Sequence, residues 1–155
     1  DPPLGVVDER AKSRRSAGAM QGGRADRSMA RAAGASLAVA WPTGQHGSMR
    51  EISGRELATR LEGGEAVYLV DVREPWEHQL TALPGSVLVP LGELPARAAG
   101  LAPPAGALVV TYCHHGVRSL SAAEFLARAG LPDVASLAGG IDAWSREVDP
   151  TVPRY

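Results

Sequence analysis

The stretch from residue 108 to residue 129 constrains the fold of this chain most strongly, because it joins two different hydrophobic patterns through a short loop. Its first five residues, Leu-Val-Val-Thr-Tyr, form an apolar run that predicts a buried strand. The part that begins at Ser119 is rich in alanine and leucine and predicts a helix. The residues between them therefore form a tight strand-to-helix loop, and Cys113, the one cysteine of the chain, lies at its mouth.

The position of Cys113 in this loop indicates a chemical role. A loop that curls into a helix N-terminus presents unpaired backbone N–H groups, and the helix adds partial positive charge, so the loop suits an anion such as a thiolate. A helix terminus alone supplies about 0.3–1 kcal/mol, so the loop amides and Arg118 are expected to add to it. We interpret Cys113 as a nucleophile inside a ring of donors, with Gly116 allowing the backbone to turn.

Two other interpretations of the loop stay open. Cys113 is a small buried hydrophobic residue in the first, as most free cysteines are, although the following His-His-Gly and an arginine at a helix start argue against it. In the second, His114 and His115 bind a metal with Cys113, but three adjacent residues cannot easily converge on one ion and no second cluster supplies further ligands. We therefore predict no metal and no cofactor, and expect both histidines to face outward at the pocket rim.

Three stretches of the chain resemble the signature motifs of the rhodanese family of sulfurtransferases, and they follow one another along the chain in the order typical of that family. Residues 113–119, Cys-His-His-Gly-Val-Arg-Ser, resemble the active-site loop of that family. Residues 71–78, Asp-Val-Arg-Glu-Pro-Trp-Glu-His, followed by Leu-Pro-Gly-Ser at 83–86, are similar to its N-terminal motif. Residues 137–144, Leu-Ala-Gly-Gly-Ile-Asp-Ala-Trp, are similar to its C-terminal motif. Together they cover most of residues 49–155.

The resemblance implies a rhodanese-like α/β fold, with a central, mostly parallel sheet of about five short strands and helices on both faces. The sequence pattern independently favours this architecture, because predicted strands alternate with predicted helices. In such sheets ligands bind at the carboxyl ends of the strands, where Cys113 lies. The expected strands are residues 50–52, 66–72, 87–89, 108–112 and 134–137. The expected helices are residues 53–61, 74–79 and 93–99, one from 119 to near 130, and one after Gly140.

Asp71, Arg73 and Glu77 follow the second expected strand and suggest either acid/base chemistry or a structural role. The resemblance implies the structural role, in which they tie the turn after this strand and brace the sheet. Arg73 and Glu77 are four residues apart, so they are placed to form an ion pair if the turn is helical. Thr81-Ala82 departs from the family pattern and leaves the details of this turn open.

Other local patterns predict packing and helix boundaries. Ser53 and Glu56 have the spacing of a capping box at a helix start. Trp76 and Trp144 are expected to be packing residues, with the edge of the pocket as an alternative place for one of them. Residues 150–155 are expected to form an extended tail on the surface.

The resemblance implies a two-step sulfur transfer. The Cys113 thiolate would attack the outer sulfur of thiosulfate or another persulfide donor, and a thiol, cyanide or carrier-protein acceptor would then take the sulfur in a ping-pong cycle. The loop amides would hold the persulfide charge, and the Arg118 guanidinium would meet the sulfonate end of the donor. The expected substrate-binding residues are His114, His115, Gly116, Val117, Arg118 and Ser119.

Two rival functions remain. One is a weakly catalytic rhodanese-like module that carries or senses sulfur within a partner complex. The other is phosphatase-like chemistry, which also uses a cysteine in an anion-binding loop. Cysteine-dependent phosphatases place five residues between cysteine and arginine, whereas four separate Cys113 from Arg118 here, and the shorter ring fits a single added sulfur better.

Charge and composition limit the remaining functions. The chain has 155 residues, which suits one domain, residues 49–155, after a disordered extension of residues 1–48. The extension has seven basic and four acidic residues, whereas the domain has nine and thirteen, which argues against nucleic-acid binding. No apolar run is long enough for a membrane span, and one reactive thiol suits the reducing cytoplasm. Vector-derived residues, an upstream segment and a targeting segment all remain possible origins of the extension.

Overall fold

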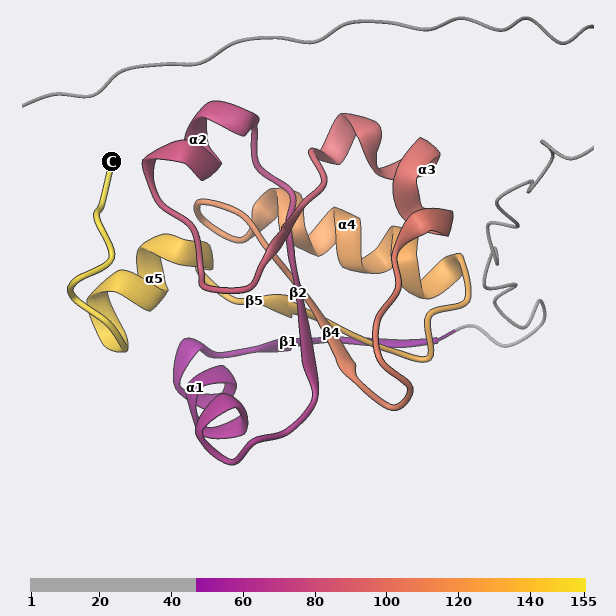
Figure 1. Ribbon diagram of the computed structural model, residues 1–155, viewed down its shortest axis with the longest axis horizontal. Coiled ribbons are helices and arrows are strands. Elements are labelled where there is room, and N and C mark those ends of the chain that lie inside the picture. The colour runs from indigo at the N-terminus through magenta and orange to yellow at the C-terminus, as the bar shows by residue number, and fades with distance from the viewer. Residues whose placement is uncertain (1–46) are drawn as a thin grey trace, which may run out of the picture. The chain divides into compact units, whose positions relative to one another are not determined.

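A computed structural model describes residues 47–155, and the expected extension therefore lies almost entirely outside the described residues. Five strands form one sheet in the order β1-β5-β4-β2-β3, and every neighbouring pair is parallel. The strands are β1 (Ser48–Ile52), β2 (Val67–Asp71), β3 (Val87–Leu88), β4 (Leu108–Tyr112) and β5 (Asp133–Leu137). Figure 1 shows this arrangement, which confirms the predicted parallel α/β sheet.

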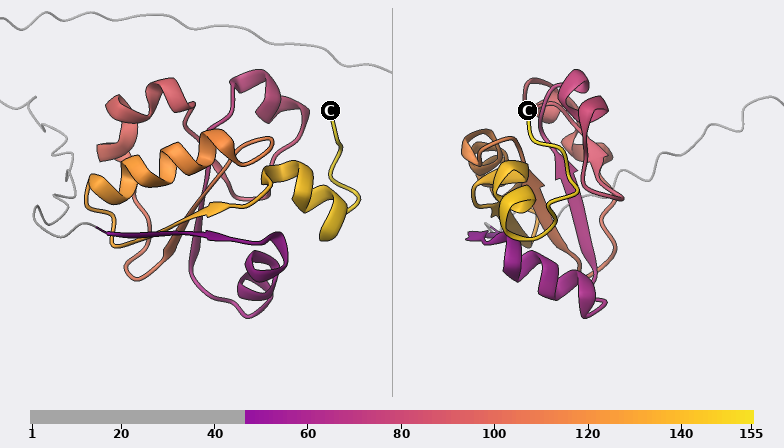
Figure 2. Two further views of the ribbon diagram at one scale, coloured as in Figure 1. Left: turned by 180° about the vertical axis from the view of Figure 1, so that it is seen from behind. Right: turned by 90° about the vertical axis from the view of Figure 1, so that its left-hand side faces the viewer.

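Helices cover both faces of the sheet. They are α1 (Gly54–Glu62), α2 (Pro75–Leu80), α3 (Leu94–Arg97), α4 (Val117–Arg128) and α5 (Gly140–Glu147). One core cluster joins α3 and α4 to one face, and a second joins α1 and α5 to the other. Figures 1 and 2 show α1 and α4 on opposite sides of the sheet. All five residues of β4 are buried, as expected of a central strand that is covered on both faces.

Two predicted helices differ from the observed ones. The expected helix at residues 93–99 is a short α3 between two 3-10 turns, η1 (Leu91–Glu93) and η2 (Ala98–Gly100). Pro95 lies in the first turn of α3, where it is tolerated because its missing N–H would have no helical partner. The helix expected from Ser119 begins two residues earlier, at Val117, because Gly116 adopts the left-handed conformation with φ 101°.

The predicted capping box at α1 is only half formed. The Ser53 side chain accepts a hydrogen bond from the Glu56 N–H at 3.1 Å, so Ser53 is the N-cap. The Glu56 carboxylate instead accepts a bond from Arg60, four residues later, at 3.2 Å. The ion pair within the helix therefore replaces the second half of the box.

The two tryptophans behave differently. Trp144 is buried in the core between α5 and the sheet, as predicted. Trp76 is 58% exposed and contacts Tyr155 edge-to-face, so it is not a core residue. Its position near the start of α2, beyond the carboxyl edge of the sheet, leaves it no core to enter.

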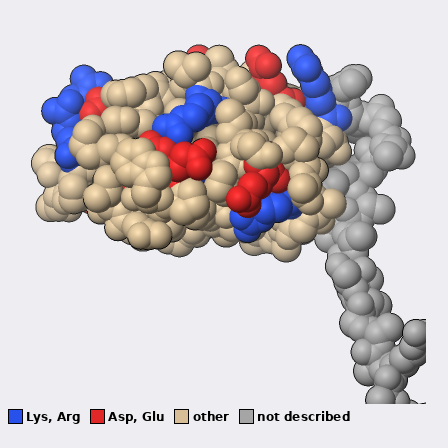
Figure 3. Space-filling view, turned by 90° about the horizontal axis from the view of Figure 1, so that it is seen from above, with Lys and Arg blue, Asp and Glu red and all other residues tan. Residues whose placement is uncertain are grey.

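Charged groups do not form a basic surface in the face seen in Figure 3. Arg groups lie mostly beside Asp and Glu groups, with uncharged areas between them. The ion pairs of the described residues include pairs four positions apart, such as Arg97 with Glu93 at 3.0 Å. Among residues 47–155, no helix is both long and apolar enough to cross a membrane.

Candidate active site

Cys113 lies where sequence analysis places it, directly after β4 at the carboxyl edge of the sheet. Residues 113–116 make the loop into α4, with Gly116 as the N-cap of that helix. The first amide of α4 to find a backbone acceptor is that of Leu120, which donates to the Gly116 carbonyl. The N–H groups of the three residues before Leu120 take no part in the helical hydrogen bonds, as at any helix start. Such groups are suited to an anion.

The sulfur atom of Cys113 has polar as well as apolar neighbours. The Cys113 residue is 1% exposed and belongs to the core cluster that includes α4. The Gly116 N–H donates to Sγ at 3.0 Å, and the Ser119 hydroxyl lies 3.6 Å from Sγ. That hydroxyl is held by the Gly116 carbonyl at 3.0 Å and the Ser136 hydroxyl at 2.9 Å. A backbone donor therefore points at the sulfur, which argues against an inert hydrophobic role.

The N-terminus of α5 fixes the cysteine loop. The Ile141 N–H donates to the Cys113 carbonyl at 2.9 Å, and the Asp142 N–H donates to the His114 carbonyl at 3.1 Å. Gly140 allows this approach, because a Cβ there would lie 2.4 Å from both carbonyl oxygens. Its φ of 62° is a second reason for glycine. The second glycine of the Gly-Gly pair in the third motif is thus explained by contact with the cysteine loop.

Arg118 forms an ion pair that sequence analysis did not predict. Its two terminal nitrogens donate to the two carboxylate oxygens of Glu77 at 2.7 and 2.8 Å. Glu77 is 3% exposed, whereas the Arg118 side chain is 35% exposed. The hydrogen bonds from Arg118 lower the pKa of Glu77 to about 2, although burial opposes the shift. The same pairing raises the pKa of Arg118, so both groups stay charged.

The predicted ion pair between Arg73 and Glu77 is wrong. Arg73 lies before α2, which begins at Pro75, so the two residues do not have the geometry of helical neighbours. Arg73 donates only to the backbone carbonyl of Glu77, at 3.3 Å, and pairs with the carboxylate of Asp71 at 2.6 Å. The i, i+4 spacing is therefore coincidental here.

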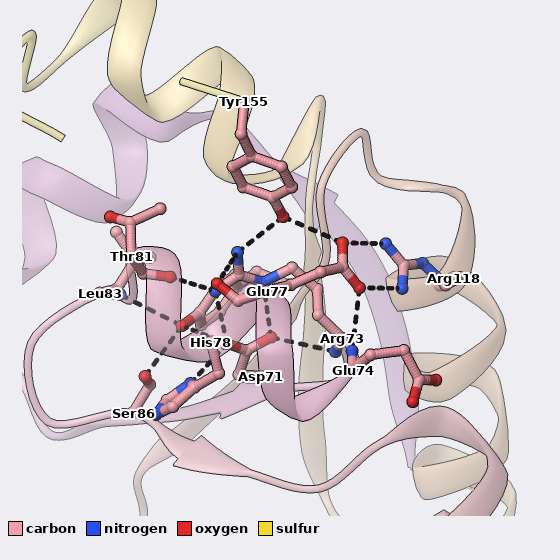
Figure 4. Close-up of polar contacts among 11 residues, drawn as sticks. Asp71, Arg73, Glu74, Glu77, His78, Thr81, Leu83, Ser86, Arg118 and Tyr155 are labelled. Atoms are coloured by element: carbon pink, nitrogen blue, oxygen red, sulfur yellow. Dashed lines mark hydrogen bonds and ion pairs between the residues drawn. The ribbon is translucent and has the colours of Figure 1, made fainter. Parts of the chain in front are cut away.

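Asp71 and Arg73 form a fully buried pair behind the site (Figure 4). Asp71 accepts bonds from Arg73, from His78 Nδ1 at 2.8 Å and from the Tyr112 hydroxyl at 3.0 Å. Burial raises the pKa of Asp71, but the hydrogen bonds from Arg73 and His78 outweigh it and lower the pKa below the usual range. Burial and the nearby Asp71 charge raise the pKa of Tyr112 to about 12. The pair therefore stabilises the turn between β2 and α2.

Residues 150–155 lie mainly on the surface, as predicted, but their contacts with the site were not predicted. Tyr155 reaches back to the site, where its hydroxyl lies 2.8 Å from a terminal nitrogen of Arg73 and 2.9 Å from the Glu77 carboxylate (Figure 4). Val152 is buried, and its carbonyl accepts a bond from the Ser145 hydroxyl. These contacts anchor the segment after α5 against the domain.

The two histidines of the loop lie at its rim. Their rings stack on each other with centroids 3.8 Å apart, and the Tyr155 ring stacks on His114 at 4.2 Å. His115 is exposed and His114 is half-buried. Burial and the neighbouring His115 lower the pKa of His114. His114 therefore tends to stay neutral near pH 7. Val117, at the start of α4, is also exposed beside this rim.

Acidification is expected to remove the stabilisation that Glu77 provides. A carboxylate whose pKa is lowered on folding stabilises the fold above its unfolded-state pKa, and this contribution is lost as the pH falls through the folded-state value. For Glu77 the window runs from 4.5 down to about 2. Glu77→Gln should flatten the fall in the free energy of unfolding across this window, measured by urea titration at several pH values.

Glu93→Gln is the matched control for this experiment. Glu93 pairs with Arg97 on the exposed surface, and such pairs contribute little to stability. The control should keep the pH profile of the parent chain. A profile for Glu77→Gln as steep as that of the parent would contradict the assignment.

These contacts define a class of protein: a parallel α/β domain whose one cysteine lies in a strand-to-helix loop at the carboxyl edge of the sheet, with a backbone N–H directed at its sulfur. The chain belongs to the rhodanese-like domain family, whose pattern matches residues 53–147, more than half of the chain. The resemblance seen in the three motifs is thereby confirmed.

Named relatives agree with this family. A sulfurtransferase from Allochromatium vinosum is 36% identical over 104 residues, which cover 67% of this chain and 95% of that protein. The probable adenylyltransferase/sulfurtransferase MoeZ of Mycobacterium tuberculosis is 37% identical over 105 residues. That match covers 67% of this chain but only 26% of MoeZ, so the chain spans about a quarter of MoeZ. A rhodanese-related protein from Thermoplasma volcanium has a crystal structure that matches with a TM-score of 0.58 and 31% identity, over 67% of this chain and 97% of that chain.

Proposed function

We propose that this domain is a sulfurtransferase that moves sulfane sulfur from a small anionic donor, such as thiosulfate, to a thiol or cyanide-type acceptor through a persulfide on Cys113. The observation that carries the proposal is the Gly116 N–H aimed at the sulfur at 3.0 Å, at the N-terminus of the 12-residue helix α4. The names of the relatives support the same reaction class.

The reaction balances without a cofactor. The Cys113 thiolate attacks the outer sulfur of thiosulfate, a new S–S bond forms, and the S–S bond of thiosulfate breaks as sulfite leaves with the electron pair. An acceptor thiolate then attacks the outer sulfur of the persulfide and releases the Cys113 thiolate. Each enzyme form is stable alone, so ping-pong kinetics are expected.

The loop amides and Arg118 have separate roles in this proposal. The amides from His114 to Ser119 surround the negative outer sulfur of the persulfide, as an oxyanion hole surrounds oxygen. Arg118 uses its terminal nitrogens for Glu77, which leaves the Nε–H edge of the guanidinium for the sulfonate of the donor. Asp71, Arg73 and Glu77 stabilise the turn after β2, which carries Glu77 as the partner of Arg118. None of the three transfers a proton.

A second candidate is a sulfur-carrier module that acts within a partner complex. The match to a quarter of MoeZ favours it, because there a comparable domain is part of a longer adenylyltransferase/sulfurtransferase. In this case the acceptor is a protein, and turnover with thiosulfate and cyanide is slow. Both candidates need a reduced thiol, for which the cytoplasm is the proposed location.

Persulfide formation tests the proposal. Treatment of the reduced chain with thiosulfate is expected to add ~32 Da, the mass of one sulfur atom, to the peptide that contains Cys113. Intact-mass and peptide mass spectrometry would detect the addition, and dithiothreitol should reverse it. Stable addition followed by slow loss to cyanide would favour the carrier module. A chain that acquires no sulfur from thiosulfate or a low-molecular-weight persulfide would refute both candidates.

A further inference from the structure

We propose that Tyr155 is a positioning residue for Arg118, and that it acts through Glu77. This role rests on the proposed function, because it concerns how Arg118 is presented to an anionic sulfur donor. Tyr155 is far from Glu77 in the sequence, since the two positions differ by 78. The segment after α5 brings it to the cysteine loop.

Hydrogen-bond chemistry fixes the direction of the Tyr155 hydroxyl. Its oxygen lies 2.8 Å from a terminal nitrogen of Arg73, and a guanidinium can only donate. The hydroxyl therefore accepts from Arg73, and its one proton is directed to Oε1 of Glu77, 2.9 Å away.

Arg73 is itself held in place, because each of its five N–H groups has an acceptor. Nε bonds Asp71, one terminal nitrogen bonds Tyr155 and the Glu77 carbonyl, and the other bonds Asp71 and the Thr81 carbonyl. The residue is also fully buried. Tyr155 thus connects a rigid buried pair to the carboxylate of Glu77.

The Glu77 carboxylate is held by one fixed donor at each oxygen. Oε1 accepts from Tyr155 at 2.9 Å, and Oε2 accepts from the Glu74 N–H at 2.9 Å. Each oxygen also accepts from one terminal nitrogen of Arg118. Loss of the Tyr155 hydroxyl would leave Oε1 with Arg118 alone, and the plane of the carboxylate would be set at one end only. A bidentate partner is sensitive to that plane, so the orientation of Arg118 would broaden.

The ring of Tyr155 is held separately from its hydroxyl. It stacks on His114 at 4.2 Å and contacts Trp76 edge-to-face at 6.0 Å. The Tyr155→Phe variant retains the ring and these contacts while removing only the hydroxyl. The fold is therefore expected to persist, and an unchanged circular dichroism spectrum would verify it.

Tyr155→Phe is expected to raise KM for thiosulfate roughly threefold to tenfold, the effect of one hydrogen bond, while kcat changes less than about twofold. Arg118→Ala should raise KM further, because it removes the donor contact itself. Tyr68→Phe is the matched control, since Tyr68 lies on β2 and its hydroxyl has no hydrogen-bond partner among residues 47–155. In a Glu77→Gln background, Tyr155→Phe should have a smaller effect on KM than in the parent chain.

A second measurement does not depend on activity. In NMR spectra of the arginine side chains, the terminal nitrogens of Arg118 should give distinct signals in the parent chain, because the bidentate pair slows guanidinium rotation. These signals should merge in Tyr155→Phe and stay distinct in Tyr68→Phe. The proposal is overturned if KM in Tyr155→Phe equals that of the control, or if the Arg118 signals are unaffected. If the parent chain forms no persulfide, the proposed function fails, and the NMR comparison still decides the role of Tyr155.

Discussion

Replacement of Cys113 with serine is expected to abolish sulfur transfer while the fold persists. A serine hydroxyl is not ionised near neutral pH and cannot form the S–S bond of a persulfide, so turnover should fall at least ~1,000-fold, as for other removed nucleophiles. Steady-state sulfite or thiocyanate release measures the loss. The ~32 Da addition should also disappear from the peptide that contains residue 113.

The structure explains why this variant should remain folded. The serine oxygen can still accept the Gly116 N–H and can bond the Ser119 hydroxyl, which now lies 3.6 Å from the sulfur. A change of about 1 kcal/mol or less in the free energy of unfolding is therefore expected. Substantial residual turnover in a folded Cys113→Ser chain would show that another group carries the sulfur.

Much of this site could be predicted from local sequence patterns. The apolar run of β4 and the helix after it place Cys113 at the carboxyl edge of a parallel sheet, and the structure agrees. The helix start is also a local property, since Gly116 sets it through its left-handed conformation. Such features depend on neighbouring residues, which a sequence displays directly.

The partners of the charged residues could not be predicted in the same way. Arg118 pairs with Glu77, which is 41 positions away, because the turn after β2 and the start of α4 meet at one edge of the sheet. The spacing of Arg73 and Glu77 suggested a helical ion pair, but α2 begins only at Pro75. Spacing rules hold only inside a helix, so the position of the helix start decided the outcome.

Tyr155 was missed because a short segment with two prolines looks like a surface tail in the sequence. A signal was present in hindsight: a buried arginine needs acceptors for five N–H groups, and a carboxylate supplies only some of them. The Arg73 side chain obtains the rest from two carbonyls and from Tyr155. That requirement predicts an additional acceptor, although it does not identify the residue.

Replacement of Arg73 with methionine is expected to lower the free energy of unfolding by about 3–5 kcal/mol at pH 7, measured by urea unfolding. Methionine is shorter than arginine but keeps most of the side-chain volume, so the main loss is not one of volume. The variant leaves Asp71 fully buried with a charge that has lost its cationic partner. Removal of one member of a buried pair costs far more than the pair contributes, because the remaining charge is desolvated without compensation.

Two comparisons distinguish this mechanism from general damage. Arg97→Met makes the same change in an exposed ion pair with Glu93, and it should alter stability by less than about 0.5 kcal/mol. Adding Asp71→Asn to Arg73→Met should recover part of the loss, because the stranded charge is gone. The deficit of Arg73→Met should also shrink at low pH, since burial raises the pKa of Asp71 once the hydrogen bonds from Arg73 no longer oppose it. The loss in the free energy of unfolding could instead be equal at pH 7 and pH 4, or no larger than that of Arg97→Met. Either result would show that the Asp71–Arg73 pair does not stabilise this turn. It would also contradict the proposal that this pair supports Tyr155 and Glu77.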